Sequence, residues 1–132
     1  MKPFKPPVPT ERQVQREILR MCGEVFPSIY IAHVPNGAHL AGGDAARFKQ
    51  MGALRGDGLK PGFPDLIVLW NYGVGFLEVK RPKSGKVSEV QEATHVKLTE
   101  LGHRVAVVYS AYEAQCVLLE WGAPASCTRW PA

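Results

Sequence analysis

The chain has 132 residues, the length of a single domain, and 45% of them are hydrophobic, which supports one packed core and excludes a disordered chain. No apolar run reaches the roughly 18 residues of a membrane span and the start lacks the apolar stretch of a signal peptide, so we expect a cytoplasmic protein that is neither secreted nor bound to a membrane. The formal net charge of +4 fits a polyanionic partner without identifying one, and three cysteines without a CxxC spacing argue against a disulfide framework or a zinc ribbon.

The first folded element is predicted to be a helix. Residues 1–10 form a basic, proline-rich arm, after which Thr10 and Gln13 have the spacing of a capping box. Apolar residues then recur at helical spacing, which predicts a helix from about Glu11 to Val25. Glu17 lies about 60° from the centre of the apolar stripe, at the border between core and solvent, where packing can hold a functional acid. The alternative is an ordinary solvent-facing residue.

A strand, a turn and a short helix are predicted next. Residues 28–34 are rich in β-formers and predict a strand, and Pro35-Asn36-Gly37 supplies turn chemistry at its end. Residues 42–52 predict a short helix, with Asp44 as its cap and the last glycine as its end. Residues 53–62 are glycine-rich and basic, which predicts a loop.

A β-hairpin is predicted over about Phe63 to Arg81. Pro64–Trp70 is a short apolar run with β-branched residues, and Gly75–Lys80 is a second run that alternates polar and apolar residues at its end. Asn71-Tyr72-Gly73 between them is turn material, and two such runs around a glycine-containing turn indicate a hairpin.

This hairpin brings two acids and a lysine together. If Trp70 pairs with Gly73, Asp65 lies opposite Glu78, and a register slip of one residue still leaves the two acids within reach of one ion. Glu78 and Lys80 project to the same face because side chains alternate along a strand. Two neighbouring carboxylates repel each other and need a cation, and a lysine beside them suits a phosphate or a hydroxide, as metal-assisted phosphodiester hydrolysis requires.

The alternative is that these residues form no site. Asp65 would then only begin a strand, and Glu78 and Lys80 would lie on a solvated strand face. The strands are otherwise apolar, however, which indicates that helices cover both faces of the sheet. An ionisable trio on a covered strand costs several kcal/mol unless it is paired or binds a metal, so the sequence favours a functional site.

The rest of the chain completes an α/β fold. Ser88 and Gln91 have capping-box spacing and open a helix that ends at Gly102. The strand–helix–strand unit that contains this helix should be parallel and right-handed, so we predict a mixed four-stranded sheet flanked by helices. We place the domain at 11–122 and a tail at 123–132. The remaining expected elements are a basic turn, a buried strand and a last helix, over 82–86, 104–109 and 111–121.

The sequence resembles a known nuclease family. Gly62-Phe63-Pro64-Asp65, followed by Glu78-Val79-Lys80, matches the PD-(D/E)XK nuclease signature. From about Glu11 to Tyr112 the chain resembles a VRR-NUC (virus-type replication-repair nuclease) domain. The further features that carry this resemblance are Glu17 on a first helix, Pro35-Asn36-Gly37 after the first strand, Ser88-x-x-Gln91 after the lysine, and residues 101–105 before the last strand.

The resemblance implies a restriction-endonuclease-like core and a divalent metal, Mg²⁺, for which Mn²⁺ would substitute. It implies that Asp65 and Glu78 bind the metal, with the backbone carbonyl of Val79 as a third ligand. It implies that Lys80 orients or activates the attacking water. Mg²⁺ prefers oxygen ligands and keeps several waters, which suits two carboxylates and a carbonyl. Whether one or two metals act stays open.

Glu17 and Gln91 align with the supporting acid and the glutamine of the family, and Glu17 is a candidate further metal ligand. At its spacing Gln91 can equally close a capping box with Ser88, and the two roles are compatible. His33 is expected in the core or behind the metal ligands rather than as a ligand itself.

Basic residues bracket the two acids and are expected to contact phosphates, although a basic loop is often only solvated. Stand-alone members of the family resemble Holliday-junction resolvases, which implies a homodimer that cuts branched DNA in a bacterium or a phage-infected host. Trp121, Trp130 and the apolar tail are candidates for the dimer interface. Two alternatives remain: a sequence-specific or exonucleolytic nuclease of the same fold, and an inactive nucleic-acid-binding module. The expected DNA-binding residues are Asn36, Arg47, Lys49, Arg55, Lys60, Arg81, Lys83 and Lys86.

Overall fold

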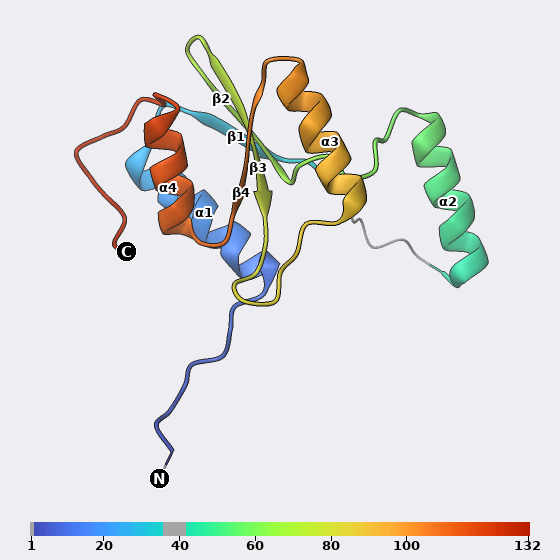
Figure 1. Ribbon diagram of the computed structural model, residues 1–132, viewed down its shortest axis with the longest axis horizontal. Coiled ribbons are helices and arrows are strands. Elements are labelled where there is room, and N and C mark those ends of the chain that lie inside the picture. Colours follow the sequence, from blue (N-terminus) through green and yellow to red (C-terminus); the bar gives the residue numbers. More distant parts are fainter. Residues whose placement is uncertain (1, 36–41) are drawn as a thin grey trace.

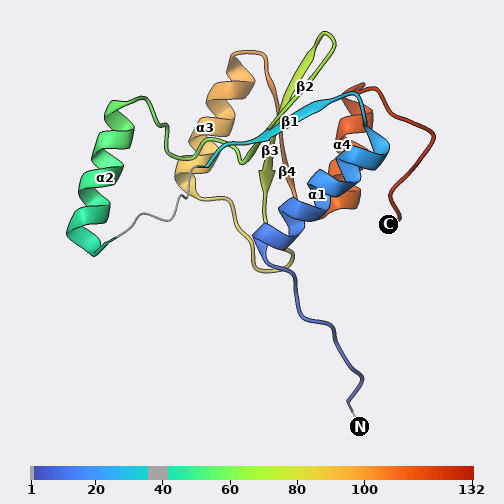
Figure 2. The ribbon, with the colours of Figure 1, turned by 180° about the vertical axis from the view of Figure 1, so that it is seen from behind.

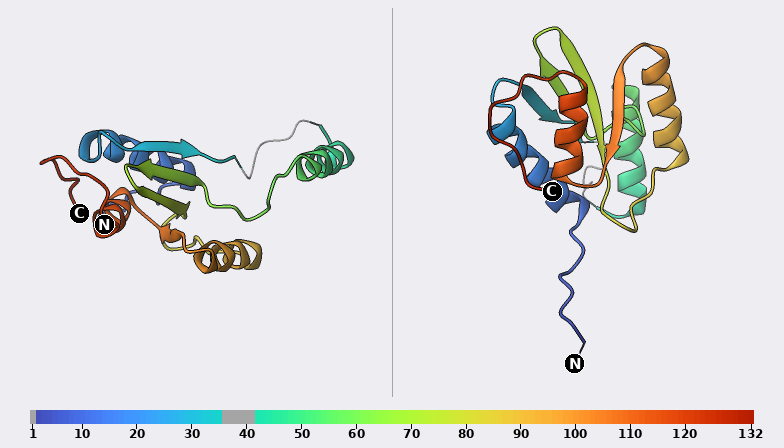
Figure 3. Two further views of the ribbon diagram at one scale, coloured as in Figure 1. Left: turned by 90° about the horizontal axis from the view of Figure 1, so that it is seen from above. Right: turned by 60° about the vertical axis from the view of Figure 1, so that its left-hand side comes forward.

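The computed structural model describes residues 2–35 and 42–132, which form an α/β fold around a mixed, open, four-stranded sheet (Figure 1). Helices α1 and α4 lie against one face of the sheet and α3 lies against the other, as the view from above in Figure 3 shows. Within these ranges the elements are α1 (Glu11–Val25), β1 (Tyr30–His33), α2 (Asp44–Gly56), β2 (Leu66–Trp70), β3 (Gly73–Val79), α3 (Glu89–Glu100), β4 (Arg104–Val108) and α4 (Ala111–Glu120).

Helix α1 has the predicted bounds and the predicted cap. The Thr10 Oγ1 accepts from the Gln13 N–H at 3.2 Å, and the Gln13 side-chain oxygen accepts from the Thr10 N–H at 2.8 Å. The capping box therefore pairs two backbone donors that a helix start otherwise leaves unsatisfied. The apolar stripe faces the sheet, and its buried members are Val14, Ile18, Met21, Cys22 and Val25.

The strands follow the order β1-β2-β3-β4, with two antiparallel pairings and a parallel pairing of β3 with β4. Trp70 pairs with Gly73 across a tight turn, which confirms the predicted register of the hairpin. Strand β1 is shorter than predicted, because it pairs with β2 only along Tyr30–His33. Strand β4 and helix α4 each end one residue earlier than expected.

The main core lies between the sheet and the pair α1 and α4. Leu66 and Val68 of β2, Leu77 and Val79 of β3, and Val108 of β4 are buried against these two helices. Every second residue of β3 thus enters this core, so the residues between them must face α3. This alternation decides on which side of the sheet the ionisable side chains lie.

The C-terminal tail packs on the same side of the molecule. The backbone of Trp130 exchanges two hydrogen bonds with the Gln115 side chain, at 2.6 and 3.1 Å. The Ser126 N–H donates to the Val25 carbonyl at 2.7 Å, which ties the tail to the end of α1. Trp121 and Trp130, the expected interface residues, pack against the core of their own chain.

Helix α2 differs from its prediction at both ends. The N-cap is Gly43, without a side-chain hydrogen bond, so Asp44 is the first helical residue and not the cap. The helix continues through Gly52 to Gly56, into the predicted loop, because an exposed glycine costs only about 1 kcal/mol within a helix. The residue that ends the helix is Gly58, whose φ of +106° is the left-handed conformation that favours glycine.

This helix also stands apart from the sheet. None of its side chains is buried, and Figures 1 and 2 show it beyond α3, at the edge of the molecule. Phe48 is 84% exposed. No helix in the described ranges is long and apolar enough to cross a membrane.

Candidate active site

The two acids of the predicted site lie across the β2–β3 hairpin. Asp65 comes directly before β2, and continuing the pairing of Leu66 with Leu77 places it opposite Glu78. The Val79 N–H donates to Asp65 Oδ2 at 2.7 Å, so the Asp65 carboxylate turns toward β3. The Asp65 carbonyl accepts from the Val34 N–H at 2.7 Å and lies 3.1 Å from His33 Nδ1. His33 therefore contacts the Asp65 backbone beside the site.

Glu78 and Lys80 are both buried between the sheet and α3. Leu77 and Val79 enter the core beneath α1 and α4, so Glu78 and Lys80 point the other way. Only 1% of Glu78 and 7% of Lys80 is exposed. Helices thus cover both faces of the sheet here, as the apolar strands predicted.

The surroundings of Glu78 disfavour the charged form of its carboxyl group. Both of its carboxylate oxygens are hidden from solvent and have no hydrogen-bond partner in the described part of the chain. Burial raises the pKa of Glu78 well above its ordinary value of 4.5, and the neighbouring Asp65 carboxyl raises it further. The charge of Lys80 acts in the opposite direction. An unpaired buried carboxylate of this kind is stabilised by either a proton or a cation.

The donors at this place fit a divalent cation. Two carboxylates lie side by side, and both Glu78 oxygens lack a donor. Within residues 2–35 and 42–132 no three His, Cys, Asp or Glu side chains gather into a metal-binding group. A cation here would thus need backbone carbonyls and waters as further ligands, which is the coordination that Mg²⁺ favours.

Lys80 is held by the backbone on both sides. Its N–H donates to the Val108 carbonyl at 3.0 Å, which continues the parallel pairing of β3 with β4. The following turn folds back so closely that a Cβ on Gly85 would lie 2.9 Å from the Lys80 Cβ and 2.4 Å from the Arg81 carbonyl oxygen. Only a glycine allows the turn to approach the lysine in this way.

The predicted supporting acid, Glu17, lies elsewhere on α1. Its half-exposed carboxylate is 3.9 Å from the Arg20 guanidinium, and it lines a hollow of about 670 Å³ with Pro7, Pro9 and neighbouring residues of α1. The acid of α1 whose charge contributes to the raised pKa of Glu78 is Glu11. Figures 1 and 2 show the start of α1 at the same end of the molecule as the β3–α3 loop. A catalytic role for Glu17 stays a prediction.

Gln91 closes the capping box of α3, as its spacing predicted. The Ser88 N–H donates to Gln91 Oε1 at 2.9 Å, and the Gln91 N–H donates to Ser88 Oγ at 3.2 Å. Its catalytic role stays a prediction as well. One turn later, His95 Nε2 lies 3.4 Å from Glu78 Oε1. His95 was not among the predicted site residues, although residues four apart on a helix share a face and Gln91 was already a candidate on that face.

Six of the seven basic residues expected to bind DNA fall into two groups. Arg47, Lys49 and Arg55 lie on α2, where the Arg47 Nε–H donates to the Gly42 carbonyl at 3.0 Å. Arg81, Lys83 and Lys86 lie in the β3–α3 loop, next to the acids. Asn36 lies outside the described residues.

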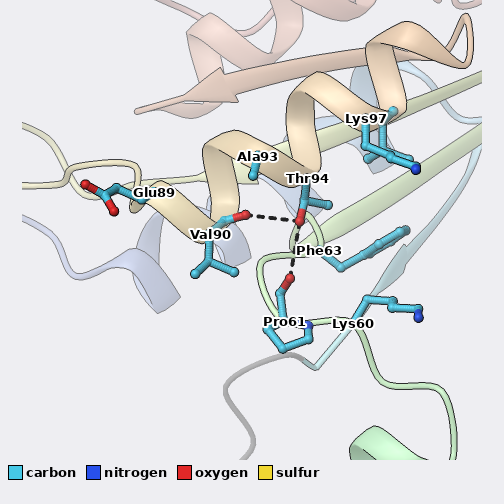
Figure 4. Close-up of a pocket in the computed structure, with 9 residues that line it drawn as sticks. Lys60, Pro61, Phe63, Glu89, Val90, Ala93, Thr94 and Lys97 are labelled. Atoms are coloured by element: carbon cyan, nitrogen blue, oxygen red, sulfur yellow. Dashed lines mark hydrogen bonds between the residues drawn. The ribbon is translucent and has the colours of Figure 1, made fainter.

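Lys60 belongs to neither group, because it borders a groove beside α3. The groove has a volume of about 640 Å³, and Figure 4 shows Phe63 and Val90 among its apolar lining. It lies between α3 and the loop before β2, and neither Asp65 nor Glu78 lines it.

Comparison with known proteins agrees with the motif. The family model described as the VRR-NUC domain matches residues 10–112, which include both acids, Lys80 and Gln91. No curated protein matches the chain. The matching domain implies a nuclease of the PD-(D/E)XK type that acts on DNA. Because this match spans most of the sequence, the chain belongs to the VRR-NUC family.

Proposed function

We propose that this protein is a metal-dependent DNA endonuclease that hydrolyses phosphodiester bonds and selects branched DNA. The observation that carries the proposal is the buried Glu78, whose two oxygens have no hydrogen-bond partner in the described ranges, beside Asp65 and the buried Lys80. A fold gains nothing from burying an acid and a lysine beside a second acid unless a cation or substrate completes the group.

Asp65, Glu78 and the Val79 carbonyl would hold the cation. When bound, Mg²⁺ neutralises the charge of the scissile phosphate and lowers the pKa of a coordinated water. The chain's own residues supply the rest. The Val79 N–H fixes the orientation of Asp65, and burial strengthens every charge interaction at Glu78. Lys80 stabilises the attacking oxygen and the charge that develops on the phosphate. We assign supporting roles to Glu17 and Gln91.

The basic residues position the DNA. The loop after Lys80 carries Arg81, Lys83 and Lys86. Phosphates that contact these side chains would therefore lie close to the acids. Arg47, Lys49 and Arg55 on α2 extend the basic surface away from the sheet. Selectivity for branched DNA and action as a homodimer follow from the resemblance to junction-cutting relatives.

A sequence-specific or exonucleolytic nuclease would use the same site, and only substrate tests separate these functions. An inactive nucleic-acid-binding module is less consistent with the structure. Such a module would have no need for a buried acid and a buried lysine beside a second acid, because phosphate binding uses exposed cations.

Cleavage and metal binding together test the proposal. The protein is incubated with four-way, flap, splayed and linear duplex DNA in Mg²⁺, Mn²⁺ or EDTA, and we expect internal cuts in branched substrates only when metal is present. Titration calorimetry with Mg²⁺ should show binding by the wild type and its loss in Asp65→Asn and in Glu78→Gln. Cleavage in EDTA would contradict metal dependence. Unchanged metal affinity in both variants would place the cation elsewhere.

A further inference from the structure

The turn at the tip of the β2–β3 hairpin holds a strained and exposed tyrosine. Trp70 pairs with Gly73, so only Asn71 and Tyr72 connect the two strands. Tyr72 has a φ of +65°, and its side chain is fully exposed. A turn whose second residue is left-handed favours glycine or asparagine there, because most other side chains are strained in that conformation. Figures 1 and 2 show this turn projecting from the sheet.

No contact within the described part of the chain accounts for a tyrosine at this position. The side chain of Tyr72 buries no surface there and forms no hydrogen bond or ring contact. The ring therefore adds strain to the turn without stabilising the fold through packing. A strained residue that the fold does not require points to a contact outside the chain.

The surroundings of the tip suit a nucleic acid. The hairpin carries no acidic residue from Leu66 to Leu77, so it does not repel phosphates. Arg104 pairs with Gly75 beside the tip, and its guanidinium lies 5.9 Å from the centre of the Trp70 ring. Arg104 is exposed and forms no ion pair within the ranges that the structure describes. Exposed aromatic rings beside a cation are the combination that binds unpaired bases and their phosphates.

We propose that Tyr72 stacks on an unpaired nucleobase at the branch point of the DNA substrate. This inference rests on the proposed nuclease function and deepens it, because it names how a branch is distinguished from a continuous duplex. The bases of a duplex stack on one another, whereas a branch point offers bases whose faces are free.

The tip lies within reach of DNA that occupies the proposed active site. Glu78 follows Tyr72 by six residues, which span about 20 Å along a strand. One DNA strand advances about 3.4 Å per nucleotide along the helix axis, so about six nucleotides cover this distance. Tyr72 and Glu78 can therefore contact the same substrate.

DNA binding in EDTA tests the inference without any cleavage. Fluorescence anisotropy compares a splayed duplex, which has unpaired arms, with a linear duplex. Tyr72→Asn keeps a residue that tolerates the left-handed turn but lacks the ring, whereas Tyr72→Trp keeps an aromatic ring. We expect Tyr72→Asn to lose about tenfold in affinity for splayed DNA and less than about twofold for linear duplex. Tyr72→Trp should keep both affinities.

Tyr112→Asn is the matched control. Tyr112 is also exposed, but it lies on α4, four residues after Val108. Val108 pairs with Val79, so Tyr112 follows the end of the sheet that is away from the hairpin tip. This variant should bind both DNAs like wild type.

Photo-crosslinking identifies the residue that contacts the base. Iododeoxyuridine in the unpaired arm couples on irradiation to an aromatic side chain stacked on it, and mass spectrometry locates the coupled peptide. We expect the crosslink at Tyr72 in wild type and its loss in Tyr72→Asn. Thermal melts should give Tyr72→Asn a Tm no lower than that of wild type, because asparagine tolerates the left-handed conformation. A lower Tm together with no crosslink at Tyr72 in wild type would make the ring a structural group and overturn the inference.

The outcomes separate this inference from the proposed function. Equal affinity of wild type and Tyr72→Asn for splayed DNA, or an equal loss on both DNAs, would overturn the stacking contact and leave the nuclease site standing. A dimer that wild type forms and Tyr72→Asn loses in light scattering, with DNA binding unchanged, would assign the tip to a contact between protein chains instead. If wild type binds neither DNA, the proposed function fails together with this inference.

Discussion

Glu78 can be neutralised in two ways, by a proton or by a cation, and the two compete for the same oxygens. Because burial and the neighbouring Asp65 raise the pKa of Glu78, the metal-free protein holds a proton there at neutral pH. Metal binding must release this proton, so the apparent metal affinity should increase with pH. At the proposed metal site, the same carboxylate would link pH, stability and metal loading.

The stability of the metal-free protein should fall as pH rises from about 7 to 9. The pKa of Glu78 is raised by burial to about 9, so the folded state keeps a proton that the unfolded chain has released. The stabilisation is complete below the ordinary value of 4.5 and is lost as pH rises through the folded value. The loss is at most about 1.4 kcal/mol per pH unit for one proton.

His95 does not oppose this trend in that range. Burial lowers its pKa, so it is neutral in both states above about pH 7. Thermal melts in EDTA at several pH values should show a falling Tm for wild type and a flatter profile for Glu78→Gln, which keeps the shape of the neutral acid. Parallel profiles for the two proteins would contradict the assignment.

Replacement of Lys80 should abolish cleavage while the fold and DNA binding persist. We expect Lys80→Ala to reduce single-turnover cleavage at least about a hundredfold, because a preorganised charge at the reacting centre is lost. Lys80 is buried, so Lys80→Met serves as the control that keeps the side-chain length without the charge. Both variants should bind DNA like wild type in fluorescence anisotropy, and near-wild-type cleavage by either one would rule out this role.

At the scale of residues, the sequence predicts those members of the candidate site that lie within one hairpin. Strand alternation and one turn are enough to predict that Asp65, Glu78 and Lys80 lie together. Both features are local in sequence. Glu11 and His95 lie near Glu78 only because α1 and α3 dock on the sheet. Docking depends on the packing of the whole domain, which periodicity does not reveal.

At the scale of elements, the loop before β2 is locked to α3. The Thr94 hydroxyl donates to the Val90 and Pro61 carbonyls at 3.1 and 3.2 Å, as Figure 4 shows. Gly62 has a φ of +79°, and a Cβ there would lie 2.6 Å from the Val90 carbonyl oxygen and 2.9 Å from the Gln91 nitrogen. The glycine that precedes the Phe-Pro-Asp sequence thus sets the distance between Asp65 and the start of α3.

Gly62→Ala should therefore destabilise the protein more than an alanine at another left-handed glycine. Gly58 is the matched control, with a φ of +106° and no atom within 4 Å of its ideal Cβ. Gly58→Ala carries only the backbone penalty of about 1–2 kcal/mol, and we expect Gly62→Ala to cost about 1–3 kcal/mol more because the helix backbone must move. Urea unfolding measures both, and equal losses would contradict the close contact.

The starts of the two helices with capping boxes were predictable, and the ends of α2 were not. The starts of α1 and α3 follow from Thr10 and Ser88 with their partners three residues on. Helix α2 has a glycine at its N-cap and buries nothing, so neither a cap nor an apolar stripe marks its ends. Its predicted end at Gly52 was wrong because one glycine weakens an exposed helix without ending it.

At the scale of the molecule, the proposed site lies on one face of an open sheet. A single site can address one DNA strand at a time, whereas a four-way junction has two-fold symmetry. A two-fold dimer would present two matching sites and would double the formal net charge of +4 that attracts the DNA. The packing of Trp121 and Trp130 on their own core leaves other surfaces for the interface, among them α2 with its exposed Phe48.

We therefore predict a homodimer that nicks two strands of a branched junction. Light scattering at micromolar concentration, with and without a four-way junction, should give the mass of two chains. Cleavage of that junction should produce paired nicks placed symmetrically about the branch point. A monomer under both conditions, or a protein that cuts flaps but never four-way junctions, would contradict this prediction.

The placement of the cysteines offers a practical handle. Cys116 on α4 and Cys127 in the tail are exposed, while Cys22 is buried in the core, where burial raises the pKa of its thiol to about 12. Helix α4 and the tail cover the face of the sheet opposite Glu78. A maleimide-coated surface would capture the molecule through these two thiols, so immobilised protein would present its acids to DNA in the solution above.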